Sequence, residues 1–354
     1  MPYTKPQLSI WERAVLVAAI LRVFANGFYA SLTGAFRGSS GSARYKNHVK
    51  LAMLRTFLAH TSVRQQQALS PSLDEIYPAF AKEKGFKPEH ITLADGTKAY
   101  WIGNPSAEKT IIWFHGGGYN LPPEPGHLNF AYNLVSSAGP SVSVLMLAYT
   151  LAPHETYPYQ LRQAVECLRY VLTDLKRKPE NISLGGDSAG ANLAIGVLSH
   201  MMHPHKEVTP LQLDGGAKLA SAILLAAWCS FRTDWPSSRD NAKKDLVSPN
   251  AGNQWSESFL GGKEKDGYNE PLSASAGWWD GLKDVVEEIF MAGGGDEILV
   301  DPIRELARQY KAVHPKVTLV IAEGEWHDRP VVTLLGQGGE QDAAIKSFVK
   351  SRLL

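Results

Sequence analysis

From Ile91 onward, short apolar runs alternate with segments of helical length, and no other feature limits the fold as strongly. The clearest apolar runs lie at residues 110–114, 142–147, 220–227 and 317–322. Strands that are apolar along their whole length are typical of a parallel sheet covered by helices on both faces. The sequence therefore predicts an α/β fold with a mostly parallel central sheet, which binds its ligands beyond the carboxyl ends of the strands.

Two segments fall outside this alternation. Residues 1–85 predict helices separated by a Gly/Ser break, and we expect them to form a helical cap ahead of a catalytic domain at residues 86–354. Residues 231–281 show no clear strand and contain four tryptophans. A stretch of this length inside an α/β core is typical of an inserted lid or cap. Its tryptophans could line a pocket or simply pack the cap onto the core.

Charge and cysteine content exclude some functions and compartments. The net charge is +1, which gives no reason to expect a nucleic-acid partner, because phosphate binding needs an excess of Lys and Arg. The two cysteines, Cys167 and Cys229, are too few for a disulfide framework and indicate free thiols. A cytoplasmic location is expected, and secretion is less favoured.

An apolar run near the N-terminus could contact a membrane. It covers residues 14–21 and continues at 23–25, with Arg13 and Arg22 flanking and interrupting it. The run is too short to span a bilayer and has no clean cleavage site after it. We therefore expect residues 10–30 to form a helix that packs on the protein or lies at a membrane surface.

The pattern G-x-S-x-G occurs at residues 186–190, between an apolar strand and an Ala-rich helix. A sharp strand-to-helix turn of this kind exposes a serine hydroxyl to a base, and the glycines let the strand and helix pack closely. Ser188 is therefore the candidate nucleophile. The alternative is an ordinary turn in which Ser188 caps the helix.

A second glycine-rich segment, His115-Gly116-Gly117-Gly118-Tyr119, directly follows the strand at residues 110–114. Consecutive glycines let backbone N–H groups turn toward a developing oxyanion. The expected donors are Gly116, Gly117 and the N–H of Ala189. His115 is expected to anchor the loop rather than act as the base. A phosphate-binding loop is disfavoured, because no Lys-Ser/Thr pair follows.

Together the two motifs resemble the hormone-sensitive-lipase-like branch of the α/β-hydrolases, which pairs an H-G-G-G loop with a G-D-S-A-G elbow. That branch often carries Tyr-Arg-Leu-Ala-Pro followed by Glu-His. This chain has Thr150 in place of the Arg and inverts the pair as His154-Glu155. The resemblance covers about residue 91 to the C-terminus and implies an α/β-hydrolase fold with a Ser-acid-His triad.

In that family the acid and the base follow late strands. Asp296 follows the strand at 289–292, and the resemblance favours it over Asp301, which precedes a proline and is expected to cap a helix. His327 follows the strand at 317–322, where the resemblance places the base. His314 is the nearest rival, but it ends a helix.

These residues predict a serine hydrolase in which His327 deprotonates Ser188, Asp296 orients His327, and an acyl-enzyme forms and is hydrolysed. No cofactor or metal is required. The expected substrate is a small-molecule ester, with acetyl or short acyl groups on a hydrophobic compound. Two alternatives remain open: an acyltransferase or cyclase of natural-product biosynthesis on the same fold, and a non-catalytic ligand-binding homologue. The sequence gives no oligomeric state.

Overall fold

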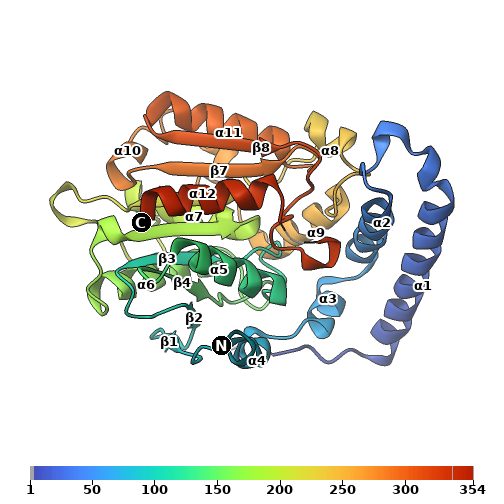
Figure 1. Ribbon diagram of the computed structural model, residues 1–354, viewed down its shortest axis with the longest axis horizontal. Coiled ribbons are helices and arrows are strands. Elements are labelled where there is room, and N and C mark those ends of the chain that lie inside the picture. Colours follow the sequence, from blue (N-terminus) through green and yellow to red (C-terminus); the bar gives the residue numbers. More distant parts are fainter. Residues whose placement is uncertain (1–3, 337, 354) are drawn as a thin grey trace.

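The protein is built around one eight-stranded sheet, shown in Figure 1. The computed structural model describes residues 4–336 and 338–353. The strand order is β1-β2-β4-β3-β5-β6-β7-β8, and every neighbouring pair from β4 to β8 is parallel, whereas β1 and β2 are antiparallel to their neighbours. The strands are β1 His90–Thr92, β2 Lys98–Ile102, β3 Lys109–Phe114, β4 Val142–Leu147, β5 Ile182–Asp187, β6 Ser221–Leu225, β7 Ile289–Gly294 and β8 Val317–Ala322.

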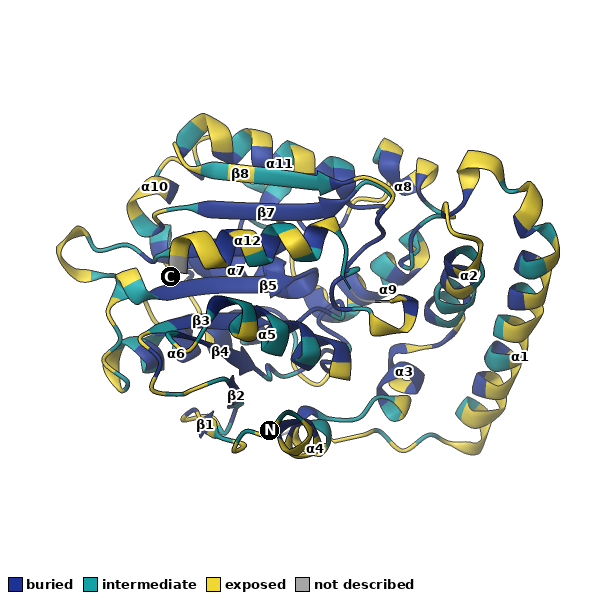
Figure 2. Cartoon of the chain, viewed as in Figure 1, coloured by how far each residue is buried: buried dark blue, intermediate teal, exposed yellow. Residues whose placement is uncertain are grey.

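Helices cover both faces of the sheet, and each face has its own core. Helices α5 and α12 lie on one face, and α6, α7 and α11 lie on the other, as Figure 1 shows. Strands β3 to β7 are almost entirely buried, because both of their faces are covered (Figure 2). These helices are α5 Pro125–Ala138, α6 Tyr159–Thr173, α7 Ala189–Met202, α11 Val300–Val313 and α12 Glu340–Leu353. The predicted fold class is therefore confirmed, and the two cysteines are buried free thiols.

The N-terminal segment forms four helices before the first strand. They are α1 Ile10–Thr33, α2 Tyr45–His60, α3 Val63–Leu69 and α4 Leu73–Lys84. Helix α1 stands at the edge of the molecule and packs on α2 (Figure 1). It agrees with the helix expected at residues 10–30, and a capping box formed by Ser9 and Glu12 sets its start.

The segment between β6 and β7 contains no strand and rises over the carboxyl end of the sheet. It contributes the short helices α8 Pro236–Asp240 and α10 Leu282–Val285 and the longer α9 Pro249–Leu260. Helix α9 contacts α2 of the N-terminal segment. The N-terminal helices and this insertion therefore meet above the edge of the sheet at which the chemical motifs lie.

Strand register brings the motifs together. Phe114 at the end of β3 pairs with Gly186 of β5, and Asp187 pairs with Leu225 of β6. Because these strands are parallel, the segments that follow them leave the same edge of the sheet. The glycine loop after β3, Ser188 after β5 and the turns after β7 and β8 are thereby placed side by side.

Candidate active site

Ser188 occupies a strained turn between β5 and α7. Its φ of 53° lies in the left-handed region, which residues with a Cβ rarely adopt. The turn is tight because Gly190 packs directly on β3: a Cβ at that position would lie 1.8 Å from the carbonyl oxygen of Phe114. The Ser188 side chain makes no capping hydrogen bond to α7. The alternative of a simple helix cap is therefore wrong, and the hydroxyl is free to face the pocket.

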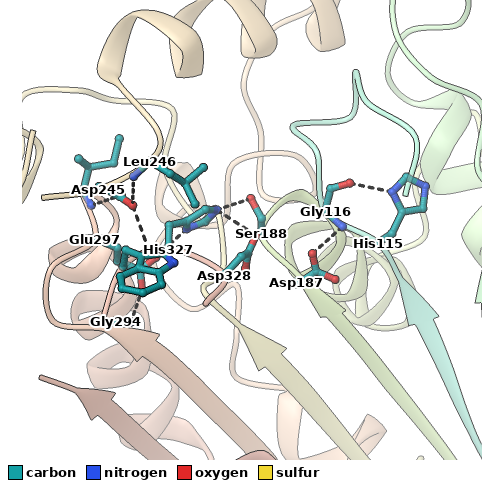
Figure 3. A network of polar contacts seen from close by, with 12 residues as sticks. His115, Gly116, Asp187, Ser188, Asp245, Leu246, Gly294, Glu297, His327 and Asp328 are labelled. Atoms are coloured by element: carbon teal, nitrogen blue, oxygen red, sulfur yellow. Dashed lines mark hydrogen bonds and ion pairs between the residues drawn. The ribbon is translucent and has the colours of Figure 1, made fainter. Parts of the chain in front are cut away.

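His327 connects Ser188 to a buried carboxylate, as Figure 3 shows. Its Nε2 lies 2.9 Å from the Ser188 Oγ, and its Nδ1 lies 2.7 Å from Oε2 of Glu297. The other oxygen of Glu297 accepts the N–H of Gly294 at 2.6 Å, and the Glu297 residue is fully buried. The imidazole is thus held between a hydroxyl and a fixed carboxylate, the geometry of a general base.

The acid predicted from sequence, Asp296, points elsewhere. Its carboxylate lies 3.5 Å from the Nζ of Lys244, and its backbone N–H donates to the carbonyl of Glu325. The tight turn after β7 sends consecutive side chains in different directions, so residue 297 and not residue 296 faces His327. The sequence-based choice compared Asp296 with Asp301 and did not consider Glu297. The adjacent Asp-Glu pair was the available signal, since this fold accepts either acid.

Asp301 is also not the helix cap that the sequence predicted. Helix α11 begins at Val300, so Asp301 lies inside its first turn, and its carboxylate accepts the backbone N–H of Ser237 at 2.8 Å.

The free backbone donors of the glycine loop differ from those expected. The N–H of Gly116 donates to Oδ2 of Asp187 at 2.8 Å, so the prediction that Gly116 faces an oxyanion is wrong. Among the described residues, no acceptor lies within hydrogen-bond distance of the N–H groups of Gly117, Gly118 and Ala189. His115 anchors the loop as expected: its Nδ1 bonds the Gly116 carbonyl at 2.7 Å, and its ring stacks on Tyr149.

Asp187, directly before the nucleophile, holds this loop in place. Its buried carboxylate accepts hydrogen bonds from the Trp113 indole, the Gly116 N–H and the Nε2 of His127, at 2.8, 2.8 and 3.1 Å. Nδ1 of His127 accepts the N–H of Glu124, so the proton on the ring lies on Nε2. Burial acts to raise the pKa of Asp187, but His127 and Trp113 stabilise the carboxylate and lower that pKa below its usual value.

Two further carboxylates lie against His327. Asp245 accepts the backbone N–H groups of His327 and Ile298 at 3.0 and 2.8 Å, and burial raises the pKa of its carboxyl to about 6. Oδ2 of Asp328 lies 3.1 Å from Nε2 of His327, the same nitrogen that faces Ser188. Burial acts to lower the pKa of His327, but Asp328 and Glu297 outweigh it and raise that pKa well above its usual range. The sequence analysis assigned no role to either residue.

A narrow cavity of about 30 Å³ adjoins Ser188 and His327. Trp255 of α9 lines it, lies against Gly118, and donates its indole N–H to Gln66 of α3 at 3.1 Å. Trp278 and Trp279 instead pack the insertion onto the core: Trp278 donates to Ser199 of α7, and Trp279 packs edge-on against Tyr310 of α11. Both expected roles therefore occur: Trp255 lines the cavity, whereas Trp278 and Trp279 pack the insertion onto the core.

The described residues contain no group of His, Cys, Asp and Glu side chains arranged to hold a metal ion. The polar groups near Ser188 instead form hydrogen bonds to one another, to His327 and to the glycine loop. The arrangement can activate a hydroxyl, stabilise an oxyanion and move one proton, which are the requirements of acyl transfer.

Comparisons with known proteins agree with this chemistry. A family model described as the alpha/beta hydrolase fold matches residues 111–330. An acetyl-hydrolase of Streptomyces hygroscopicus is 25% identical over 252 residues, which cover 70% of this chain and 77% of that protein. An esterase of Acinetobacter venetianus is 26% identical, and the match covers 74% of this chain and 80% of that protein. An esterase structure from the bacterial hormone-sensitive lipase family matches with a TM-score of 0.64 at 22% identity, covering 95% of this chain and 99% of the other.

Proposed function

The chain belongs to the α/β-hydrolase fold family and is a carboxylic-ester hydrolase, and we propose that it works through a Ser188–His327–Glu297 triad and an acyl-enzyme. One observation carries the proposal: His327 lies 2.9 Å from the Ser188 hydroxyl on one side and 2.7 Å from the Glu297 carboxylate on the other. A serine becomes an effective nucleophile only when a base takes its proton as it attacks.

Acylation follows from this geometry. Nε2 of His327 takes the Ser188 proton while Oγ bonds to the ester carbonyl carbon, and the carbonyl oxygen becomes an oxyanion. Glu297 accepts the Nδ1–H of His327 and stabilises the imidazolium that forms. The imidazolium then gives its Nε2 proton to the leaving alkoxide, which departs as the alcohol and leaves the acyl group on Ser188.

The N–H groups of Gly117, Gly118 and Ala189 are the proposed donors to the oxyanion. Asp187 supports them indirectly, because it fixes the neighbouring Gly116 and thus the path of the loop. The start of helix α7 also favours negative charge at this point. In deacylation His327 takes a proton from water as the water oxygen bonds to the acyl carbon. The bond to Oγ then breaks, Ser188 regains its proton from His327, and the carboxylic acid leaves.

The size of the cavity favours a small acyl group. A volume of about 30 Å³ is far below the 300 Å³ or more of typical ligand pockets. Its lining includes Trp228, Phe231, Val247 and Leu299, so the cavity is apolar. We therefore propose an acetyl or similarly short acyl ester of a hydrophobic compound, and the similarity to an acetyl-hydrolase supports this choice.

A chain-length series of p-nitrophenyl esters tests the proposed substrate class. We expect kcat/KM for the acetate to exceed that for the palmitate at least about 100-fold, because a long chain must displace the cavity walls and 100-fold corresponds to about 2.7 kcal/mol of lost transition-state binding. The Val247→Ala variant widens the cavity and should move the preference toward the butyrate. Faster hydrolysis of palmitate than of acetate would contradict a short-acyl specificity.

The pH dependence should be set by the carboxylates around His327. The base must be neutral, so a pKa raised by Asp328 and Glu297 places the acid limb of the kcat/KM profile at higher pH than an unperturbed histidine would. Asp328→Asn removes one charge, lowers the His327 pKa, and should move this limb to lower pH by about one unit or more. Asn tolerates the φ of 51° at this position, so the backbone is retained.

The profile is measured with p-nitrophenyl acetate between pH 5 and about 9, the range in which a perturbed histidine titrates. Glu207→Gln, at an exposed acid remote from the site, is the matched control and should leave the profile in place. An acid limb that stays at the same pH in Asp328→Asn would show that Asp328 does not stabilise the charged form of His327.

A further inference from the structure

The outer face of helix α1 is apolar over its whole length. Eight large side chains on α1 are more than half exposed, and Phe36 lies just beyond the helix: Ile10, Trp11, Val17, Leu21, Phe24, Phe28, Tyr29 and Leu32. In Figure 2 this face is the outermost part of the molecule. The helical segment Ile10–Phe36 contains an 18-residue window with a mean hydropathy of 1.7, and by length and composition it could cross a membrane. An exposed apolar surface of this extent indicates a site that contacts a membrane or another protein.

The inner face of the same helix is tied to the cap by specific contacts. Asn26 donates to the Thr56 hydroxyl of α2, Arg64 of α3 bonds the carboxylate of Glu12, and Gly27 packs on Met53. A helix that crossed a bilayer would have to abandon these polar contacts. In the structure, one face of α1 instead packs on the protein, and the opposite face is exposed.

The charge distribution indicates what that outer face meets. Residues 1–73 contain nine Lys and Arg and a single acidic residue, Glu12, whereas residues 74–354 contain 27 basic and 34 acidic residues. Within the helical cap, Arg13, Arg22, Arg44, Lys46 and Lys50 are exposed. The small net charge of the chain is thus the sum of a basic N-terminal segment, which is also rich in exposed apolar residues, and an acidic remainder. Apolar and cationic character together match an anionic lipid surface, and cationic character alone would not explain the row of Phe and Leu.

The position of α1 connects this face with the Ser188 cavity. An open groove of about 880 Å³ lies between α1 and α9, lined by Trp11 and Val15 on one side and Asn253 and Glu257 on the other. Gly252 and Trp255, on the other side of α9, line the cavity at Ser188. Helix α9 therefore borders both the groove beside α1 and the cavity at Ser188.

We propose that α1 is a docking surface for anionic lipid membranes, on which the helix lies in the plane of the interface. Its apolar side chains enter the boundary between headgroups and acyl chains, and the arginines and lysines around it pair with lipid phosphates and carboxylates. This docking goes beyond the proposed ester chemistry and does not depend on it.

Co-sedimentation of the full chain with vesicles tests the docking. One set of vesicles is phosphatidylcholine alone, and the other contains about 30 mol % phosphatidylserine. We expect binding to the anionic vesicles that is at least about tenfold stronger than to the neutral ones, and that about 0.5 M salt weakens, because salt screens the charge attraction. Phe24→Glu combined with Phe28→Glu should reduce the bound fraction at least about tenfold, since both side chains lie on the outer face.

The matched control is Leu69→Glu, which places the same charge on a half-exposed leucine of α3. It should bind vesicles as the unchanged protein does. All variants should hydrolyse p-nitrophenyl acetate in water at the unchanged rate, so a failure of docking is distinguishable from a failure of catalysis.

Three results would overturn the proposal. The first is equal sedimentation of the unchanged and doubly substituted proteins with anionic vesicles. The second is a lipid-free dimer that the Phe24 and Phe28 substitutions dissociate, which would make α1 an interface between two copies. The third is vesicle binding that resists both salt and alkaline carbonate, which would indicate a membrane-spanning helix.

Discussion

Replacing Ser188 with Ala is expected to lower kcat for p-nitrophenyl acetate on the order of a million-fold. The hydroxyl forms the covalent bond in the proposed mechanism, and no neighbouring group can take its place in the same geometry. Alanine keeps the Cβ, so the φ of 53° is no more strained than in the native protein and the fold should be retained. Turnover and labelling by a fluorophosphonate report the loss, and an unchanged melting temperature shows that the variant is folded.

Ser230→Ala provides the matched control. Ser230 also lines the Ser188 cavity and is buried, but its hydroxyl bonds Glu270 and makes no contact with His327. Its loss should change kcat less than about tenfold, because the Ser230 hydroxyl bonds Glu270, Arg232 and Trp235 and none of the reacting groups. Comparable activity in Ser188→Ala and the native protein would refute the triad. If neither protein turned over esters or reacted with a fluorophosphonate, the non-catalytic alternative would be favoured.

Glu297→Gln is expected to reduce kcat about 10⁴-fold, equivalent to about 5.4 kcal/mol. The structure explains why an isosteric change should be so costly. The N–H of Gly294 requires an acceptor, so the amide oxygen of the Gln must face it, and the NH₂ group must then face His327. His327 would have to accept at Nδ1 and carry its proton on Nε2. In that tautomer it cannot take the proton of Ser188.

Asp296→Asn separates the two candidate acids. The Asp296 carboxylate lies 3.5 Å from the Nζ of Lys244, and a single partly exposed ion pair contributes little. We expect kcat within about threefold of the native value, because Asp296 contacts neither Ser188 nor His327. A loss of several orders of magnitude in Asp296→Asn, together with an active Glu297→Gln, would restore Asp296 as the acid and show that the turn after β7 rearranges in solution.

Much of the fold could be predicted from sequence because each buried strand is apolar along its full length. The run at residues 142–147 coincides with β4, and the run at residues 317–322 coincides with β8. Ser188 and His327 were expected to lie close together because each follows a strand within a few residues, and the structure places them 2.9 Å apart.

The errors have a common cause: sequence distance does not give side-chain direction within a turn. Asp296 and Glu297 are neighbours, yet only one faces His327. Gly116 and Gly117 are also neighbours, but the Gly116 N–H is paired with Asp187, a residue 71 positions away. Asp245 reaches His327 from the insertion, 82 positions away in the chain, and no local pattern marks it. The charge contrast between the N-terminal 73 residues and the remainder was visible in the sequence but was hidden by the net charge of +1.

The carboxylate of Asp187 joins three segments that are remote in the chain: β3 through Trp113, the glycine loop through Gly116, and α5 through His127. Separating any of them would leave a buried charge short of partners, which is costly enough to discourage local opening. We therefore expect hydrogen exchange at β3, the glycine loop and the start of α5 to be slower than in the N-terminal helices and the insertion.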